Sequence, residues 1–299
     1  MAEPIVLLVD DDPLNLDILL EALEGQGFLL ETAQDGQRAW EMLLAAPTKY
    51  SAIILDRMMP RLDGLALLKI IKSHPVLRNI PVIMQTAAAL NHQILEGLQA
   101  GAYYYLTKPY DFRVALSIVR AALRDGLHNE ELRRELQVAG GSASLLRSAH
   151  YQLQTLTEAH NLALSLSHAF PEPQHVVTGL EALLNNAIEH GNLGIGYKYK
   201  AALEVHGGLA AEVARRQALP ENASKWVDVY FRRDEQWIIV EINDQGSGFD
   251  WQPYLEVSAE RALSLNGRGI ALARSQSFDE LVFENNGSRV VARTRIHND

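Results

Sequence analysis

The 299-residue sequence has no cysteine, no long hydrophobic run and no excess of positive charge. The lack of cysteine excludes disulfides, Cys-ligated zinc and thiol chemistry, and it fits a reducing compartment. No apolar stretch reaches the roughly 20 residues that span a bilayer. The N-terminus runs straight into a strand pattern, without a signal-peptide profile. We therefore expect a cytoplasmic protein that does not associate with membranes.

The deficit of positive charge bears on the partners of the protein. The formal net charge is −10, whereas nucleic-acid binding usually requires a basic face that replaces counterions. We therefore expect no nucleic-acid partner. The content of 47% hydrophobic and 21% charged residues is typical of a globular protein, and the length allows two domains.

Residues 1–125 alternate between strand-like and helix-like patterns. Strands are predicted at residues 5–9, 28–33, 51–55, 80–85 and 103–106, and helices at 14–24, 35–45, 64–73, 91–100 and from 111 onward. Five such units predict an α/β domain with a doubly wound, five-stranded parallel sheet.

Reactive side chains stand where these predicted strands end. Asp10 and Asp11 follow the first strand, Asp56 the third, Thr86 the fourth and Lys108 the fifth. Three crowded carboxylates repel one another and need a hard cation, and oxygen ligands of this kind suit Mg²⁺. With Mg²⁺ and the Lys108 ammonium neutralising the incoming oxygens, Asp56 can act as a nucleophile that accepts a phosphoryl group.

Residues 1–125 resemble the receiver domains of two-component response regulators. The acidic pair, the D-x-x-M-P-x-x-D-G segment at 56–64, the Thr and the Lys-Pro pair all occur in order. The resemblance implies a flavodoxin-like fold with strand order 2-1-3-4-5, and a sensor histidine kinase as partner. It also implies a cis Lys108–Pro109 bond and a Tyr105 ring that rotates inward when Thr86 moves.

The same resemblance bears on the lifetime of the phosphoryl group. In receivers, the residues two beyond the acceptor and two beyond the Thr tune attack by water, and here these are Met58 and Ala88. Neither offers a polar group that would orient water. We therefore expect a long-lived phosphate.

Residues 126–146 are predicted to form a helical linker. The helical pattern continues from Asp111 to Leu136 and breaks at Gly140-Gly141. The charge run at 130–135 is either a solvated helix face or part of a two-helix dimer seam, which leaves a homodimer open.

Residues 147–299 show a different order of elements. A strand is predicted near 150–154, helices at 157–169 and 175–190, and strands near 226–232, 237–243, 280–284 and 289–295. This order predicts helices packed on one face of a mixed sheet.

Three short motifs in this second half are suited to a nucleotide. Asp244 at a strand end can accept a hydrogen bond from an adenine amino group, and Gly246 and Gly248 allow backbone to approach the base. Asn186, on the helix that also carries His190, offers Mg²⁺ a neutral oxygen. The Gly-Arg-Gly segment, which opens another helix, presents backbone N–H groups to phosphate; it consists of Gly267, Arg268 and Gly269. Together the motifs predict an ATP pocket without a Walker loop.

These motifs resemble the histidine-kinase-like ATPase fold, an α/β sandwich, over about residues 147–299. The N-A-I-E-H-G-N sequence favours its anti-sigma-factor serine-kinase branch, as does the short lid, which is the segment between Phe249 and Gly267. Ser288 stands at the place of the branch's Gly-Thr element near adenine. The resemblance implies that the output, regulated by the receiver, acts on a sigma factor or on an anti-sigma antagonist protein.

One position departs from that branch. The branch places a catalytic Glu four residues before the Mg²⁺-binding Asn, but position 182 is Ala and Glu181 is one residue too early. One residue on a helix is about 100° of rotation. A kinase with slow turnover and a non-catalytic ATP-binding module that sequesters a partner both stay open. A histidine autokinase is a third reading, although His168 lacks the residues that follow a phosphoacceptor histidine.

Overall fold

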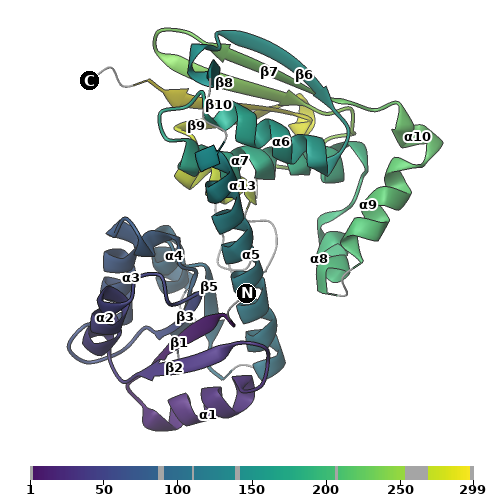
Figure 1. The fold of residues 1–299 in the computed structure, drawn as a ribbon. Coiled ribbons are helices and arrows are strands. Elements are labelled where there is room, and N and C mark those ends of the chain that lie inside the picture. The colour runs from purple at the N-terminus through teal and green to yellow at the C-terminus, as the bar shows by residue number, and fades with distance from the viewer. Residues whose placement is uncertain are drawn as a thin grey trace. The chain divides into compact units, whose positions relative to one another are not determined.

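The computed structural model describes residues 3–86, 91–109, 111–138, 142–205, 208–252 and 269–296. The chain divides into two compact units, with the first boundary between His128 and Asn129. That boundary lies inside the predicted linker. Each unit is described by itself below (Figure 1).

The first unit is built on a five-stranded sheet of order β2-β1-β3-β4-β5, in which every pair is parallel. The strands are β1 Ile5–Val9, β2 Leu29–Ala33, β3 Ala52–Asp56, β4 Val82–Thr86 and β5 Tyr104–Thr107. The helices are α1 Pro13–Leu23, α2 Gly36–Ala45, α3 Gly64–Ser73, α4 Asn91–Gln99 and α5 Phe112–Val138. The predicted fold and strand order are confirmed.

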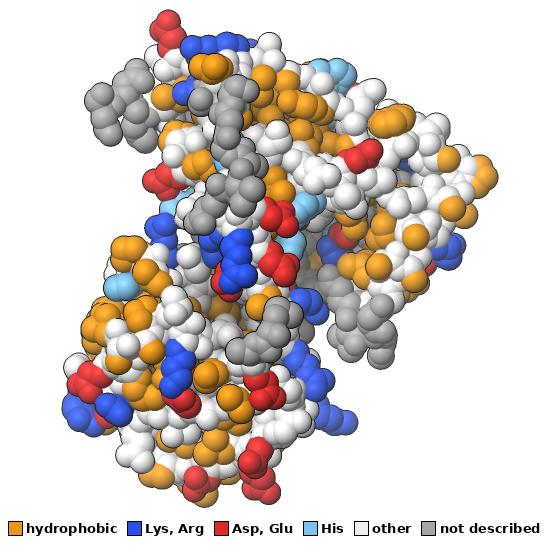
Figure 2. All heavy atoms as spheres, viewed as in Figure 1, with side chains coloured by type: hydrophobic (Ala, Val, Ile, Leu, Met, Phe, Trp, Pro, Cys, Tyr) orange, Lys and Arg blue, Asp and Glu red, His pale blue; other side chains and the backbone are white. Residues whose placement is uncertain are grey.

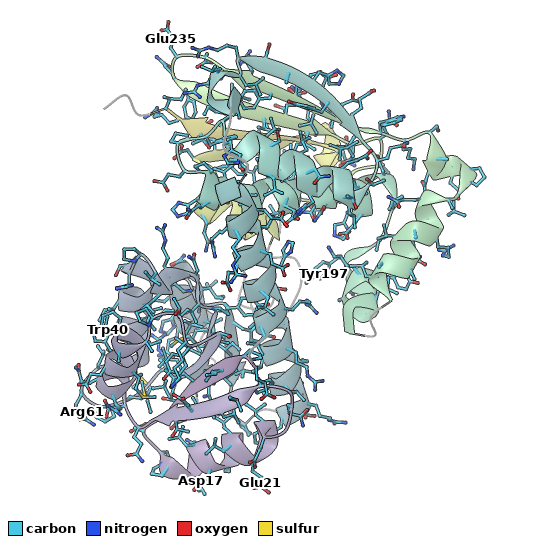
Figure 3. All side chains as sticks on the ribbon, viewed as in Figure 1. Asp17, Glu21, Trp40, Arg61, Tyr197 and Glu235 are labelled. Atoms are coloured by element: carbon cyan, nitrogen blue, oxygen red, sulfur yellow. The ribbon has the colours of Figure 1, made fainter. Side chains whose placement is uncertain are left out.

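The central strands are buried on both faces, which explains why they read as continuous apolar runs. Leu7 and Ile53 point into one core, whereas Val6 and Ile54 point into the other. Asp12, Asp35 and Asp63 cap the helices that follow β1, β2 and β3; each accepts a hydrogen bond from a backbone N–H of the first turn. The capped helices begin shortly after β1, β2 and β3, so the carboxyl ends of these strands lie along the same edge of the sheet. Asp17 and Glu21 point outward from α1 (Figure 3).

Helix α5 is continuous over 27 residues and passes the boundary between the units. Its charged segment is not solvated on all sides, because Leu132 and Leu136 are buried in the core of the second unit. These two leucines are therefore packed within the chain rather than exposed for a two-helix seam.

The second unit contains a sheet of order β6-β7-β8-β10-β9. The strands are β6 Ser148–Leu153, β7 Val227–Arg233, β8 Trp237–Asn243, β9 Glu280–Glu284 and β10 Arg289–Arg295. All four pairs are antiparallel. The predicted mixed sheet is therefore wrong for the described residues: alternation of apolar and polar side chains identifies strands but not the direction in which they pair.

Helices α6 Leu156–Ser167, α7 Pro173–Asn186 and α13 Gly269–Leu272 lie on one face of this sheet (Figure 1). The predicted second helix ends as a π-helical segment, Ala187–Asn192. Three further helices, which the sequence analysis did not predict, lie between this segment and β7: α8 Tyr197–Val205, α9 Leu209–Gln217 and α10 Pro220–Ala223. Tyr197, at the start of α8, is labelled in Figure 3. No helix among the described residues has the length and apolar character to cross a membrane.

Candidate functional site

The rim of the first sheet brings together three predicted residues. The Lys108 Nζ atom lies 2.7 Å from Asp10 Oδ2 and 2.6 Å from Asp56 Oδ1. Lys108 and Asp10 directly follow β5 and β1, and Asp56 is the last residue of β3, so their approach depends on the parallel strand order. The Lys108–Pro109 peptide bond is cis, as the resemblance implied.

The remaining oxygens of both carboxylates are held by local hydrogen bonds. Asp56 Oδ2 accepts a hydrogen bond from the Met58 N–H at 2.7 Å, and Asp10 Oδ1 accepts one from the Asp12 N–H at 3.0 Å. Asp10 and Asp56 are 1% and 6% exposed, whereas Asp11 is exposed. The carboxylate of Asp56, the predicted nucleophile, is therefore held in one orientation by its hydrogen bonds.

The charges of this site depend on burial and on the lysine. Burial raises the pKa of the Asp56 carboxyl, the charge of Asp10 raises it further, and the opposing pull of Lys108 is weaker. Burial alone would lower the pKa of Lys108, but its hydrogen bonds to Asp10 and Asp56 outweigh this and raise it. Lys108 is therefore an ammonium, and one lysine does not fully compensate the buried carboxylates.

That deficit of positive charge is what a divalent cation would correct. The described residues contain no group of three or more acidic or histidine side chains that could enclose a metal alone. Mg²⁺ does not need such a cage, since it keeps several waters and commonly binds one or two carboxylates together with phosphate oxygens. Asp10 and Asp56, with the exposed Asp11 next to Asp10 in the sequence, fit this kind of site.

Sequence reasoning missed Arg57, which follows Asp56 directly. Its guanidinium donates hydrogen bonds to the Tyr105 hydroxyl at 2.8 Å and to Glu96 Oε2 at 2.7 Å. The Tyr105 ring is fully buried, and it fits there because a Cβ on Gly97 would lie 2.3 Å from the ring. Tyr105 thus lies inward in this structure.

The other predicted receiver positions lie as follows. Thr86 is buried at the carboxyl end of β4. Met58 is 72% exposed beside the site. Ala88 lies outside the described residues.

In the second unit, the Asp244 carboxyl is the centre of the predicted nucleotide site. A Cβ on Gly191 would lie 2.3 Å from Asp244 Cγ, so only glycine lets the π-helical segment approach this carboxyl. Asp244 Oδ1 accepts a hydrogen bond from the Gly246 N–H at 2.8 Å. Burial raises the pKa of Asp244 to about 6, against the lowering effects of that hydrogen bond and of the Lys225 charge.

The loop after Asp244 packs against the loop that carries Ser288. The Asp244 N–H donates to the Ser288 carbonyl at 2.9 Å, and the Ser288 hydroxyl donates to the Asn285 carbonyl at 2.9 Å. Gly248 has a φ of 77°, and a Cβ there would lie 2.0 Å from the Asn286 oxygen. Both the backbone conformation and the close approach therefore require glycine.

Positions 181 and 182, the two candidates for the catalytic glutamate, face different sides of helix α7. A Cβ on Gly269 would lie 3.4 Å from Ala182 Cβ and 3.9 Å from Asn186 Nδ2, so the third motif faces Ala182 and Asn186. Glu181 Oε1 instead lies 2.9 Å from Nδ1 of His160, whose Nε2 lies 3.0 Å from Glu135. Glu181 is thus committed to a different side of α7.

Two further predicted positions remain. His190 Nδ1 is paired with the Ile195 carbonyl, and burial lowers the pKa of this histidine. Gly267 and Arg268 lie outside the described residues.

Comparison with known proteins identifies the first unit. Residues 6–120 match the family model of the response regulator receiver domain. The response regulator PleD of Caulobacter vibrioides is 35% identical over 147 residues, which are 47% of this chain and 32% of PleD. The DNA-binding dual master transcriptional regulator RpaA of a Synechocystis species is 36% identical over 121 residues, which are 40% of this chain and 49% of RpaA.

A solved structure of a Francisella response regulator receiver domain is 34% identical and has a TM-score of 0.38; the match covers 41% of this chain and 98% of that one. The chain spans a third to a half of the length of PleD and RpaA. Residues 6–120 of this chain therefore belong to the response regulator receiver family, in which phosphorylation controls signalling.

Proposed function

We propose that Asp56 is the phosphoacceptor of the receiver and that a sensor histidine kinase is its donor. The observation that carries this is the Lys108 Nζ atom, placed within 2.7 Å of both Asp10 and Asp56. An Asp56 oxygen attacks phosphorus, the bond between phosphorus and the donor breaks, and an acyl phosphate forms. Lys108 offsets the charge of the phosphoryl oxygens.

A bound Mg²⁺ would supply further charge neutralisation, and Asp10, Asp11 and Asp56 would hold it. The test is intact-protein mass spectrometry after incubation with a small phosphodonor and Mg²⁺. The wild-type protein should gain one phosphoryl group, and the Asp56→Asn variant should gain none. Undiminished phosphorylation of the variant would contradict the assignment.

We also propose that the second unit is an ATP-binding output domain of the histidine-kinase-like type, regulated by the receiver. The observation that carries this is the half-buried Asp244 carboxyl, which two glycines approach at backbone level. Asp244 would accept the adenine amino group, Asn186 would bind the Mg²⁺ of Mg-ATP, and the Gly267 to Gly269 segment would bind phosphate. His190 and Ser288 would shape the pocket wall. Calorimetry with Mg-ATP on wild-type protein and the Asp244→Asn variant tests this site.

The output would act in the cytoplasm on a protein, either a sigma factor or an anti-sigma antagonist, and not on nucleic acid. The net charge of −10 supports this. Acidic as well as basic side chains appear on the face of the first unit that Figure 2 shows. A pull-down with phosphorylated and unphosphorylated protein tests it. Recovery of DNA instead of a protein partner would contradict it.

A second candidate function is a non-catalytic module that binds ATP and sequesters its partner. It is favoured by the contact between Glu181 and His160, because this contact keeps the nearest glutamate away from Asn186. Phosphotransfer from labelled ATP to a supplied antagonist distinguishes the two functions. Acid-labile label on the protein itself would instead indicate a histidine autokinase.

A further inference from the structure

The residue after Asp244, Gln245, makes two of three linked hydrogen bonds that the nucleotide motifs do not include. The Gln245 N–H donates to Asn192 Oδ1 at 2.8 Å. The Gln245 side-chain Oε1 accepts from the Trp226 N–H at 3.1 Å. Lys225, next to Trp226, donates from Nζ to the Asn192 carbonyl at 2.9 Å. We call these four residues the Gln245 clasp.

The clasp joins three segments that are distant in the sequence. Asn192 ends the π-helical segment after α7, Lys225 and Trp226 lead into β7, and Gln245 follows β8. Asn192 is 4% exposed, so its side-chain amide is part of the interior rather than a surface contact. A buried polar side chain with fixed partners holds its neighbours in a defined position.

Lys225 is itself held in place by the segment that contains helices α8, α9 and α10, which we call the three-helix insertion. Its Nζ also donates to Asn222 Oδ1 at 2.9 Å. Asn222 in turn donates from Nδ2 to the Arg216 carbonyl at 3.1 Å, and Arg216 donates to the Leu193 and Gly194 carbonyls. The three-helix insertion is therefore hydrogen-bonded to the segment 192–194 in two ways: directly through Arg216, and through Asn222 by way of Lys225.

A cavity of about 370 Å³ borders the clasp, and its lining includes Asn192, Lys225 and Gln245. The loop after Asp244 consequently has space to move if the clasp opens. The position of the Asp244 carboxyl then depends on contacts made by the residue that follows it.

We propose that Lys225 is a positioning residue that acts through Asn192 to hold the Asp244 loop in the conformation that binds nucleotide. The proposal rests on the proposed function of Asp244 as the adenine-binding residue. Lys225 also acts on Asp244 through its charge, and it is the charged side chain among the described residues whose charge affects that carboxyl. The other groups against Asp244 are the backbone of Gly191, Gly246 and Ser288.

The test compares Mg-ATP affinity of wild-type protein, Lys225→Met and Asn192→Ala. At pH 8, where Asp244 is ionised, each single variant should bind about tenfold more weakly, and the double variant should be no weaker than either single one. The control is Lys198→Met, which removes an exposed lysine of the same insertion and should bind as the wild type does. Additive losses in the double variant would overturn the proposal.

The pH profile separates positioning from a general loss of structure. Affinity of the wild type should fall as the pH drops through about 6. Lys225→Met should shift this midpoint upward, because a nearby positive charge is lost, and Lys225→Arg should restore it. Weaker binding at every pH with an unchanged midpoint would overturn the proposal.

A readout without nucleotide distinguishes failure of the clasp from failure of the proposed function. Lys225→Met should increase the hydrogen-exchange rate of the Gln245 amide about tenfold, while Lys198→Met should not change it. If wild-type protein fails to bind Mg-ATP, the ATP site is wrong and the clasp is still judged by exchange. If the Gln245 amide exchanges at the same rate in Lys225→Met, the clasp is wrong.

Discussion

Arg57 donates a 2.8 Å hydrogen bond to the hydroxyl of Tyr105, a residue 48 positions further along the chain. This bond connects the residue after the proposed phosphoacceptor to a fully buried ring on β5. Arg57 also pairs with Glu96 on α4 at 2.7 Å. Strand β3, strand β5 and helix α4 are therefore joined through one side chain beside the acceptor.

We expect the Arg57→Met variant to lose the inward position of Tyr105. The Tyr105 oxygen would lose its buried donor, which typically costs about 1–3 kcal/mol of unfolding free energy. Fluorine NMR of protein containing 3-fluorotyrosine should show exchange broadening at Tyr105, and chemical denaturation should show the loss of stability.

The matched control for this variant is Arg113→Met. The Arg113 side chain is 91% exposed and pairs only with nearby Asp111 in the described contacts. It should change neither the Tyr105 signal nor the stability. An unchanged Tyr105 signal in Arg57→Met would mean that packing against Gly97 alone holds the ring.

The acceptor end of the receiver could be predicted from the sequence because its signals are local. Asp10, Asp56 and Lys108 each follow an apolar strand, and a doubly buried parallel sheet brings such positions to one rim. The contact of Arg57 with Tyr105 could not be predicted, since it depends on side chains that only the folded chain brings together.

The second unit shows a different limit. The described residues between 193 and 225 include few buried apolar side chains, and α9 buries only Val213 and Glu212, so no helical apolar period identifies these helices. Asn192 lies in the N-A-I-E-H-G-N sequence, but nothing local shows that its side chain binds the Gln245 amide. The antiparallel pairing of the sheet is likewise a tertiary property.

We expect Asp244→Asn to make the second unit more stable at neutral pH. Burial raises the Asp244 pKa from 3.8 to about 6, so the folded state holds its proton more tightly than the unfolded state does. The cost of ionisation therefore appears as the pH rises from about 4 to 6 and is fully present above that. Allowing for partial exposure, the Asn variant should gain on the order of 1–2 kcal/mol at pH 7.5 and nothing at pH 4.

The same variant should bind Mg-ATP more weakly, by about 1–3 kcal/mol, because the carboxylate acceptor is lost. Thermal unfolding from pH 4 to 8 and calorimetry with Mg-ATP check the two effects separately. Weaker binding together with lower stability at pH 7.5 would indicate a structural role for Asp244 instead.

We expect Met58 to prolong the life of the phosphorylated receiver. Its apolar side chain is 72% exposed next to Asp56, and it has no polar group that would orient a water molecule. Met58→Asn introduces an amide that can orient water, and it should speed dephosphorylation about tenfold. Intact-mass time courses after removal of the phosphodonor measure the rate. Equal rates for both proteins would show that another residue controls access of water.

Ala182 provides the test of catalysis in the second unit. It faces Gly269 beside Asn186, while Glu181 is paired with His160. If the branch's general base is missing, the Ala182→Glu variant should raise phosphate transfer or hydrolysis by about 10²–10⁴-fold with little change in ATP affinity. Glu181→Ala, the matched variant, should leave turnover of the wild type unchanged, because its carboxylate is held on the other side of α7. Rapid wild-type turnover that Glu181→Ala abolishes would show instead that Glu181 is the base. No turnover in any variant, with ATP still bound, would make the partner-sequestering module the better account of this unit.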